Sequence, residues 1–355
     1  MPDRRLRRRD FLKVSGASAA TLGASGAVRL EQPVGIKTGR AGGAAAITAA
    51  AAAKSPEIAL DSQYPKLAMI TPYSPQKLAF ATAAGYEGVV IPLDDFFDPD
   101  RLTDTQIDSI RSTSHSTGAR IISIECMWGL NHIDPEPAQR VNVHARFIRC
   151  IEFAHRLGCK FIGTFSGGIP GATGDRQAKE LAEVVNEKYV PLLDKLDMHM
   201  GWENYPTREN FATVPELCGR VFDLVPSHRL GLEYDPSHFV RQYVDPIATA
   251  WRFRDRIFAA HAKDTEIVQP TLQQVGIHGQ GWWRYRIPGQ GLIDWPKFIT
   301  VLLQAGFRGG LAVEHEDKFW DEPNTAHQPD FPQARKDGFI LANRFLRMYL
   351  PTRLS

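Results

Sequence analysis

The sequence predicts an α/β protein folded as a (β/α)8 barrel, and three observations support this fold class. Eight short apolar segments follow one another between residues 66 and 315, and eight strands close such a barrel. Segments with a helical spacing of apolar residues separate them, as in parallel sheets that helices cover. The last four apolar segments end in acidic or imidazole side chains, and barrel enzymes carry their catalytic groups at these carboxyl ends.

The predicted strands are the eight apolar segments: 66–71, 88–92, 120–126, 160–165, 199–204, 230–235, 257–262 and 310–315. The predicted helices lie between and after them, at about 75–84, 104–117, 138–157, 175–195, 213–224, 246–255, 294–305 and 331–349. Eight such units in one chain favour a closed barrel over an open sheet. The first strand runs into "ITPYSPQ" and not into a glycine-rich loop, which argues against a dinucleotide-binding fold.

The composition is that of a globular protein, with 43% hydrophobic and 23% charged residues among 355. The formal net charge is +2, but the first 54 residues hold ten Lys or Arg against three Asp or Glu. The remainder of the chain is therefore mildly acidic, which matches a phosphate backbone poorly. We expect no nucleic-acid partner.

Residues 1–54 are predicted to be an export signal followed by an alanine-rich linker, and residues 55–355 to be the barrel. The segment "RRDFLK" (8–13) resembles the twin-arginine export signal. The weakly apolar run after it is too short and too small-sided to be a stable membrane anchor. We expect the twin-arginine machinery to export the folded protein to the periplasm or another extracytoplasmic site. The alternative is a basic, disordered N-terminus.

Four consecutive predicted strands bring candidate metal ligands to one rim of the barrel. Glu203 ends the fifth strand, Asp235 the sixth, His261 the seventh and Glu314 the eighth. Adjacent strand ends lie close together in a barrel, so these groups can converge. Three carboxylates and one imidazole suit Mn²⁺, which we favour, or Mg²⁺, Co²⁺ or Zn²⁺. A bound cation would also offset the repulsion among the carboxylates.

Each of these residues taken alone would more often be a solvated rim residue or a helix cap. His238, three residues after Asp235, either contacts the metal or substrate or is an ordinary loop histidine. Strand alternation places His315 on the opposite face from Glu314, where we expect a structural role. Glu233 shares a face with Asp235 one layer deeper, and we expect it to be a satisfied interior polar group.

Five motifs together resemble a known superfamily: "WEN", "DPSH", "HAKD", "IPGQGLIDWPKF" and "GFRGGLAVEHED". They are similar to the sugar isomerase/epimerase superfamily of xylose isomerase-like barrels. The likeness is greatest to its tagatose-3-epimerase and inosose-dehydratase-like branch. It extends over residues 65–349 and is strongest from Glu203 to Asp317.

The resemblance implies roles for the rim residues. It assigns Glu203 and Glu314 to the metal and also to acid/base catalysis, and it completes the metal site with Asp235 and His261. It also implies that His238 contacts the substrate.

The chain departs from the epimerase pattern at one position. The epimerases place an arginine six residues after the metal histidine, where this chain has Ile267. Arg284 or Arg286 could replace that arginine from the following loop.

The implied chemistry is isomerisation or epimerisation of an unphosphorylated ketose or keto-sugar through an enediolate. The sequence shows no phosphate cradle, so a sugar or cyclitol without phosphate is expected. The alternative is a dehydratase or lyase that acts on keto-sugars, inososes or 3-keto-glycosides with the same site. Both are enzymes with a small-molecule partner, and homo-oligomerisation stays open.

Substrate contacts are predicted from the loops that follow the strands. Trp283, in the long connection 267–293, could stack on a sugar ring, while Trp128 and His132 could line the other side. The alternative is that these side chains pack the loop or a subunit interface. Lys263 is expected to contact the substrate or a metal ligand, and is otherwise an ordinary cation on the rim.

Two other classes of protein fit less well. Endonuclease IV-like repair enzymes share the barrel and an Asp-x-x-His motif, but the histidines that their three zinc ions need are missing here. A sugar-binding protein on a decayed barrel would have lost its acid/base pair, whereas Glu203 and Glu314 are both present.

Overall fold

Eight parallel strands close into a barrel, which confirms the predicted fold class. The structure is a computed structural model that describes residues 65–321 and 328–350. The predicted signal and linker, residues 1–54, lie outside the described residues.

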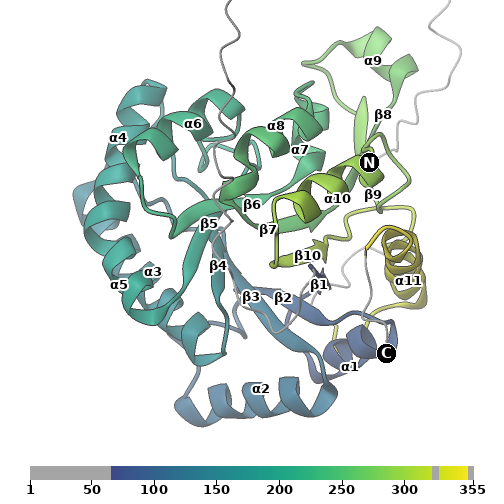
Figure 1. The fold of residues 1–355 in the computed structure, drawn as a ribbon, viewed down its shortest axis with the longest axis horizontal. Coiled ribbons are helices and arrows are strands. Elements are labelled where there is room, and N and C mark those ends of the chain that lie inside the picture. The colour runs from purple at the N-terminus through teal and green to yellow at the C-terminus, as the bar shows by residue number, and fades with distance from the viewer. Residues whose placement is uncertain (1–64, 322–327, 351–355) are drawn as a thin grey trace, which may run out of the picture. The chain divides into compact units, whose positions relative to one another are not determined.

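The strand order around the barrel is β1-β10-β7-β6-β5-β4-β3-β2, and β1 pairs with β2 to close the ring (Figure 1). The barrel strands are β1 (Lys66–Ile70), β2 (Gly88–Pro92), β3 (Arg120–Cys126), β4 (Phe161–Thr164), β5 (His199–Glu203), β6 (Leu230–Tyr234), β7 (Ile257–Ala262) and β10 (Gly310–Val313). Because all neighbouring strands are parallel, their carboxyl ends meet at one rim.

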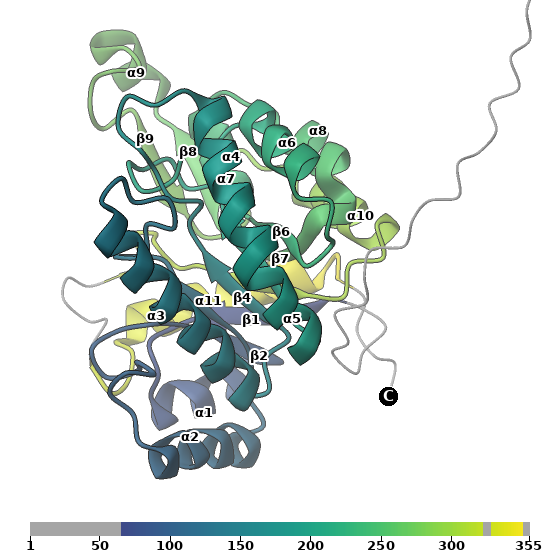
Figure 2. The same ribbon diagram turned by 90° about the vertical axis from the view of Figure 1, so that its left-hand side faces the viewer.

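Helices cover the outside of the barrel, and Figure 2 shows α3 to α5 along one flank. They are α1 (Pro75–Ala83), α2 (Asp104–Thr117), α3 (Pro137–Arg156), α4 (Gly174–Val184), α5 (Val190–Leu196), α6 (Pro215–Leu224), α7 (Pro236–Arg241), α8 (Pro246–Phe253), α10 (Trp295–Gln304) and α11 (Gln333–Arg347). A π-helical turn, Val185–Tyr189, joins α4 to α5, and a 3-10 turn, Arg254–Arg256, follows α8.

Local sequence signals set several helix ends. Thr103 and Gln106 form a capping box at the start of α2, and Gly118 ends that helix in the left-handed conformation at φ 75°.

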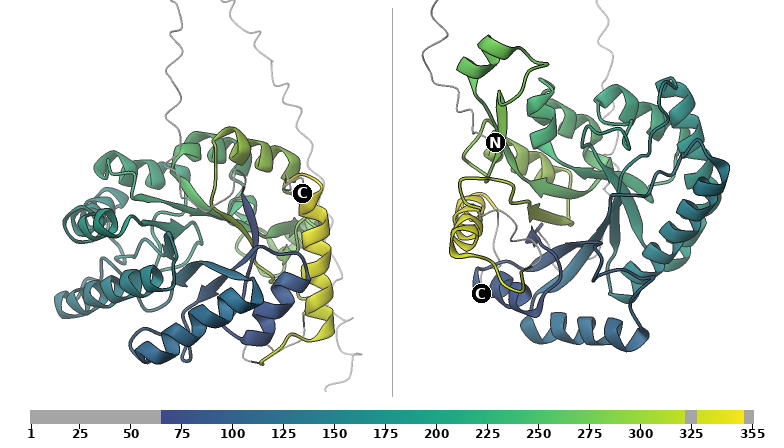
Figure 3. Two further views of the ribbon diagram at one scale, coloured as in Figure 1. Left: turned by 60° about the horizontal axis from the view of Figure 1, so that its bottom comes forward. Right: turned by 180° about the vertical axis from the view of Figure 1, so that it is seen from behind.

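In α11, Phe339 packs against Phe80 of α1, and Figure 3 shows these helices running beside each other. No helix among residues 65–321 and 328–350 is long and apolar enough to cross a membrane.

The main apolar core lies between the strands and the helices, while apolar side chains inside the barrel form only small clusters. Residues Ala68, Val90, Ile122 and Ala312 form one interior cluster. Toward the rim, polar side chains from β3, β5, β6 and β7 are buried inside the barrel. The burial of charged groups at this level is costly unless they are paired or bind a cation.

The connection after β7 is more ordered than the sequence suggested. Residues 267–293 were expected to form a long loop, but β8 (Asp264–Ile267) and β9 (Trp283–Arg286) pair as an antiparallel hairpin with α9 (Gln269–Val275) between them. Asp264 holds this hairpin to the barrel, because its carboxylate accepts hydrogen bonds from the Gly289 and Ile293 amides and from Trp295 Nε1.

Candidate active site

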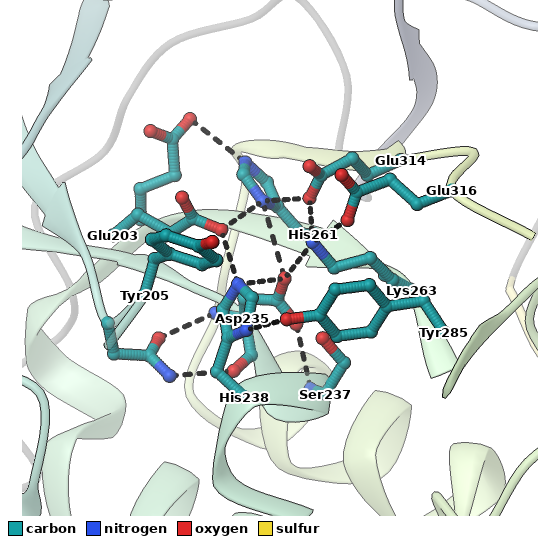
Figure 4. A network of polar contacts seen from close by, with 12 residues as sticks. Glu203, Tyr205, Asp235, Ser237, His238, His261, Lys263, Tyr285, Glu314 and Glu316 are labelled. Atoms are coloured by element: carbon teal, nitrogen blue, oxygen red, sulfur yellow. Dashed lines mark hydrogen bonds and ion pairs between the residues drawn. The ribbon is translucent and has the colours of Figure 1, made fainter. Parts of the chain in front are cut away.

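The four candidate ligands converge inside the rim, as Figure 4 shows. His261 Nδ1 lies 3.2 Å from Glu203 Oε1, 3.0 Å from Glu314 Oε2 and 3.7 Å from Asp235 Oδ2. One ligand atom from each of the four residues lies within 4.8 Å of the others. The structure therefore brings together the four side chains that were predicted to converge.

Two hydrogen bonds join the carboxyl ends of β5 and β6 next to this cluster. Asn204 Nδ2 donates a hydrogen bond to the Asp235 carbonyl, and the Asp235 amide donates one to Asn204 Oδ1, both at 2.8 Å. Asp235 also begins α7, with Oδ1 accepting a hydrogen bond from the Ser237 amide at 2.7 Å. Its other oxygen, Oδ2, is buried without a hydrogen-bond partner and points into the cluster. This pairing fixes Glu203 and Asp235 side by side.

His238 joins the cluster from the first turn of α7. Its Nε2 lies 3.0 Å from Glu203 Oε1 and 3.2 Å from Asp235 Oδ2, and its Nδ1 lies 2.8 Å from the Tyr285 hydroxyl. An ionised carboxylate is an acceptor only, so Nε2 donates the hydrogen bond to Glu203 Oε1. The Tyr285 hydroxyl contacts the ring on its other side, at Nδ1.

Lys263 brings a buried cation to the same carboxylates. Its Nζ lies 2.7 Å from Glu314 Oε2, 2.9 Å from Glu316 Oε2 and 3.2 Å from Asp235 Oδ2. The ammonium group also lies 4.4 Å from the centre of the Tyr285 ring. The lysine is therefore in contact with the candidate ligands, and its position is not that of an isolated rim cation.

The cluster perturbs the titration of its members strongly. Burial opposes the ionisation of Glu203, but His261 and His238 outweigh it and lower the pKa of Glu203 to about 2. Burial likewise opposes the charged form of Lys263, yet Glu314, Asp235 and Glu316 hold its pKa well above its ordinary value. Glu203 raises the pKa of buried His261 in the same way. The rim is a strongly acidic site that attracts positive charge.

The donor set fits a divalent ion. Glu203, Asp235 and Glu314 supply carboxylate oxygens and His261 supplies one imidazole nitrogen, which is a set typical of hard or borderline divalent metals. Asp235 Oδ2 is buried without a hydrogen bond, although His238 Nε2 and Lys263 Nζ each lie 3.2 Å from it, and a bound cation would satisfy such an oxygen. Lys263 alone cannot neutralise the acids that surround it.

A second acidic layer lies one step deeper, on the other side of the His261 ring. His261 Nε2 is 3.3 Å from Glu125 Oε1 and 3.4 Å from Glu233 Oε1. Glu233 is fully buried and neither of its carboxylate oxygens has a hydrogen-bond partner, so it is not the satisfied polar group that was expected. A Cβ atom on Gly163 would lie 1.9 Å from Glu233 Oε2, so the glycine provides the space for this carboxylate.

A cavity of about 570 Å³ opens from the cluster across the mouth of the barrel. Glu203, His261, Lys263, Glu314 and Glu316 line one end of it. Trp128 lines its wall, where we expected it, and is 65% exposed. The side chains that can do chemistry therefore face a space large enough for a small-molecule ligand.

Two predicted substrate contacts lie elsewhere. His132 is fully buried and does not line the cavity, because its ring nitrogens lie 3.0 Å from the Tyr189 hydroxyl and 2.9 Å from Thr164 Oγ1. This position corrects the expected contact with substrate. Trp283 is in β9 and lines a neighbouring cavity of about 480 Å³, where the Arg241 guanidinium lies 4.5 Å from its ring.

The arginines of the hairpin are bound to carboxylates. Arg284 pairs with Glu266, while Arg286 pairs with Glu266 and with Asp317. Neither arginine lines the cavity beside the cluster. Neither therefore takes the place of the epimerase arginine, whose position is occupied by Ile267 in this chain. His315 points away from the barrel axis, and its ring packs against Phe339 of α11.

Two residues of the site, Tyr285 and Glu125, were not predicted from the sequence. Tyr285 comes from the hairpin, and nothing in residues 267–293 indicated which side chain would return to the rim. Glu125 is in the strand "RIISIEC", where its place among apolar residues indicates burial.

Comparison with known proteins supports the same architecture. The family model described as xylose isomerase-like TIM barrel matches residues 78–334. An inosose dehydratase from Geobacillus kaustophilus (strain HTA426) is 23% identical over 205 residues, which cover 52% of this chain and 64% of that protein. The matched part is thus under two thirds of that relative's length.

Solved structures give the same fold at low identity. D-allulose 3-epimerase from Methylomonas sp., solved with D-allulose, has a TM-score of 0.62 at 14% identity and covers 81% of this chain and 98% of its own. Mannonate dehydratase from Streptococcus suis serotype2 has a TM-score of 0.64 at 13% identity and covers 81% and 95%. One relative is thus an epimerase and two are dehydratases.

Proposed function

Because the chain belongs to the xylose isomerase-like TIM barrel family, we propose that it is a divalent-metal-dependent isomerase or epimerase of an unphosphorylated ketose or keto-sugar. The observation that supports this most is the convergence of Glu203, Asp235, His261 and Glu314, three of which (Glu203, His261 and Glu314) line the cavity. The proposed reaction passes through an enediolate, with Glu203 and Glu314 as its acid and base.

The four converging groups would hold the metal, and Mn²⁺ is our candidate. When bound, such an ion acts as a Lewis acid that stabilises negative charge on a carbonyl oxygen of the substrate, typically by several kcal/mol. Lys263 lines the same cavity, where it can orient the substrate's hydroxyl groups. His238 is fully buried and does not line the cavity, so its expected contact with substrate is replaced by a contact with Glu203.

The order of the strands supports a two-sided acid/base pair. Glu203 is the last residue of β5, and Glu314 comes directly after β10. Strands β6 and β7 lie between β5 and β10 in the barrel. A sugar bound above Asp235 and His261 would therefore have one glutamate on each side. One glutamate removes the proton next to the carbonyl and the other returns a proton, each step contributing roughly 10²–10⁴-fold to the rate.

A dehydratase or lyase is the second candidate, and Lys263 is the observation that favours it. Its ammonium group lies at the cluster and donates hydrogen bonds to Glu314 and Glu316, so a charged hydrogen-bond donor is available to stabilise a leaving hydroxyl or glycosidic oxygen. The inosose dehydratase relative is consistent with this reaction. The same substrate proton would be removed in both cases.

The distinguishing experiment is turnover in D₂O. The Mn²⁺-loaded protein is incubated with ketoses, inososes and 3-keto-glycosides, and the products are analysed by NMR and mass spectrometry. Solvent deuterium in an epimer or isomer supports the isomerase, whereas a dehydrated or cleaved product supports the lyase. The absence of deuterium exchange with every class, at full metal occupancy, would reject both.

We also propose export through the twin-arginine machinery to the periplasm or another extracytoplasmic site. The support is the segment "RRDFLK" (8–13) in a strongly basic leader. Replacing Arg8 and Arg9 by lysine should leave the protein in the cytoplasm, as cell fractionation would show. Unchanged export of this variant would contradict the proposal.

A further inference from the structure

The cavity extends well beyond the candidate ligands. From Glu203 and Glu314 it crosses the barrel mouth to Asp94 and Arg101, in the segment after β2. A substrate whose carbonyl and neighbouring hydroxyl reach the four ligands must place its reacting ring at one end. Cavities of about 300–1,000 Å³ hold drug-sized ligands, so about 570 Å³ leaves room for a second ring beyond the first.

A cluster of three aromatic side chains, Trp128, Phe165 and Tyr205, lines the cavity. Trp128 packs edge-on against Phe165, with ring centres 5.1 Å apart, and lies 6.0 Å from Tyr205. Phe165 and Tyr205 stack at 5.9 Å. All three side chains line the cavity, and Trp128 keeps most of its surface exposed there. Rigid aromatic surface of this kind suits the apolar face of a sugar ring.

The far end of the cavity is polar without being basic. Arg101 pairs with Asp95 at 2.9 Å, and Arg146 pairs with Asp98 at 2.6 Å. Asp94 Oδ1 accepts hydrogen bonds from the Phe96 and Phe97 amides, which fixes its carboxylate at the cavity wall. The arginines are already matched by acids, so a phosphate or carboxylate would find no free positive charge. Neutral hydroxyl groups would find both donors and acceptors.

We propose that the site takes a two-ring glycoside, in which a keto-sugar is joined to a second, uncharged sugar ring. The keto-sugar lies at Glu203, Asp235, His261 and Glu314, and the second ring lies beyond Trp128 toward the segment after β2. This inference rests on the proposed function, since it names the substrate class of the same site.

The test compares one keto-hexose with its glycoside carrying a second hexose, in the Mn²⁺-loaded full-length protein. Deuterium exchange in D₂O gives kcat/KM for each substrate. We expect the two-ring substrate to be favoured by about tenfold or more, which corresponds to about 1.4 kcal/mol of additional binding. A phenyl glycoside of the same keto-hexose should react more slowly than the hexosyl glycoside, because it offers no hydroxyl groups to the far end.

Two variants locate the effect. Arg101→Ala and Trp128→Ala should each lower kcat/KM for the two-ring substrate more than for the free keto-hexose. Arg111→Ala is the matched control, because Arg111 is an exposed arginine of α2 that pairs with Asp108 and does not line the cavity. It should change neither value.

The outcomes distinguish a failure of the second sugar subsite from a failure of the proposed function. Equal kcat/KM for the one-ring and two-ring substrates would overturn the second subsite and leave the proposed function standing. A phenyl glycoside as good as the hexosyl glycoside would overturn the recognition of a second sugar. No exchange with any substrate would instead overturn the proposed function, and this inference with it.

Discussion

Lys263 is the residue whose surroundings explain most about the acidic rim. Its ammonium group lies within 3.2 Å of oxygens from Asp235, Glu314 and Glu316, two of which belong to the candidate metal ligands. Without that charge, the carboxylates would face one another in a buried site. The same charge holds the acids in place and limits how much positive charge a bound ion must supply.

Lys263→Met should therefore destabilise the protein most strongly when metal has been removed with a chelator. Breaking a buried ion pair typically costs about 3–5 kcal/mol, and the partial exposure of Glu314 should place this one near the lower value. Thermal unfolding with and without Mn²⁺ measures the effect, and added metal should close most of the gap to wild type. Lys297→Met, which removes an exposed pair with Asp294, is the control. Equal losses in both variants would contradict this role.

The deeper carboxylates Glu125 and Glu233 contact the imidazole ring of His261, which is one of the candidate metal ligands. Both face His261 Nε2, while Nδ1 faces the ligands, so their position favours the tautomer that keeps Nδ1 free to bind an ion. Burial raises the pKa of Glu233 to about 8. Burial raises the pKa of Glu125 as well.

Glu233→Leu should weaken Mn²⁺ binding by roughly tenfold or more, in line with other losses of a carboxylate that orients a metal histidine. Glu233→Gln keeps a hydrogen-bond acceptor at the same place and should lose less. Isothermal titration of Mn²⁺ into each folded variant gives the dissociation constants. If the leucine variant binds Mn²⁺ as tightly as wild type, Glu233 does not orient His261.

At the scale of elements, the β8–β9 hairpin completes the site. It carries Tyr285 over the rim, where the hydroxyl is 2.8 Å from His238 Nδ1 and the ring lies beside Lys263. Asp264 holds the base of the hairpin through hydrogen bonds from Gly289, Ile293 and Trp295. An insertion in one strand-to-helix connection thus positions a histidine that contacts Glu203.

Tyr285→Phe should lower kcat by up to roughly tenfold, because a hydrogen bond of this kind contributes about 0.5–1.5 kcal/mol. Metal affinity should not change, since Tyr285 contacts His238 and not an ion ligand through its hydroxyl. Steady-state kinetics and Mn²⁺ titration check both points. Tyr243→Phe is a matched control, because Tyr243 stacks on Trp282 away from the cluster. A change in Mn²⁺ affinity without a change in kcat would refute this role.

The sequence predicted some elements of the site and not others for physical reasons. Glu203, Asp235, His261 and Glu314 lie at the carboxyl ends of buried parallel strands, and closure of the barrel brings such strand ends together whatever the loops do. Tyr285 depends on the path of an inserted hairpin, which local patterns do not specify.

The interior carboxylates depend on register, which is also not a local property. Glu233 lies beside Glu125 and His261, which come from β3 and β7, and the register of β6 against β7 shifts between Leu232 and Glu233. His132 was misplaced because the chain folds back after β3, so that its ring is covered by Phe147 and Tyr189.

At the scale of the whole molecule, the two ends of the barrel differ in their roles. The candidate active site lies at the carboxyl ends of the strands, while His199 begins β5 at the opposite end and packs against Phe258. Burial lowers the pKa of His199 to about 4, so the folded protein keeps it neutral. Groups at this end should affect stability and leave catalysis unchanged.

The pH dependence of stability tests this division. Between pH 6.5 and about 4.5 an unfolded chain protonates His199 and the folded protein does not, so this residue makes stability fall as pH falls. The loss should reach about 2 kcal/mol at pH 4.5, at about 1.4 kcal/mol per pH unit. Urea unfolding at pH 7 and 4.5 should show a smaller loss for His199→Gln than for wild type, with turnover at pH 7 unchanged. The same loss in both proteins would contradict the assignment.

The central claim is that one rim glutamate transfers the substrate proton while it helps to hold the metal. Glu314→Gln keeps the size of the side chain and one oxygen but removes the base. Measured by solvent deuterium incorporation at confirmed full Mn²⁺ occupancy, its turnover should fall by roughly 10²–10⁴-fold. Near-wild-type deuterium incorporation in this variant would contradict the account.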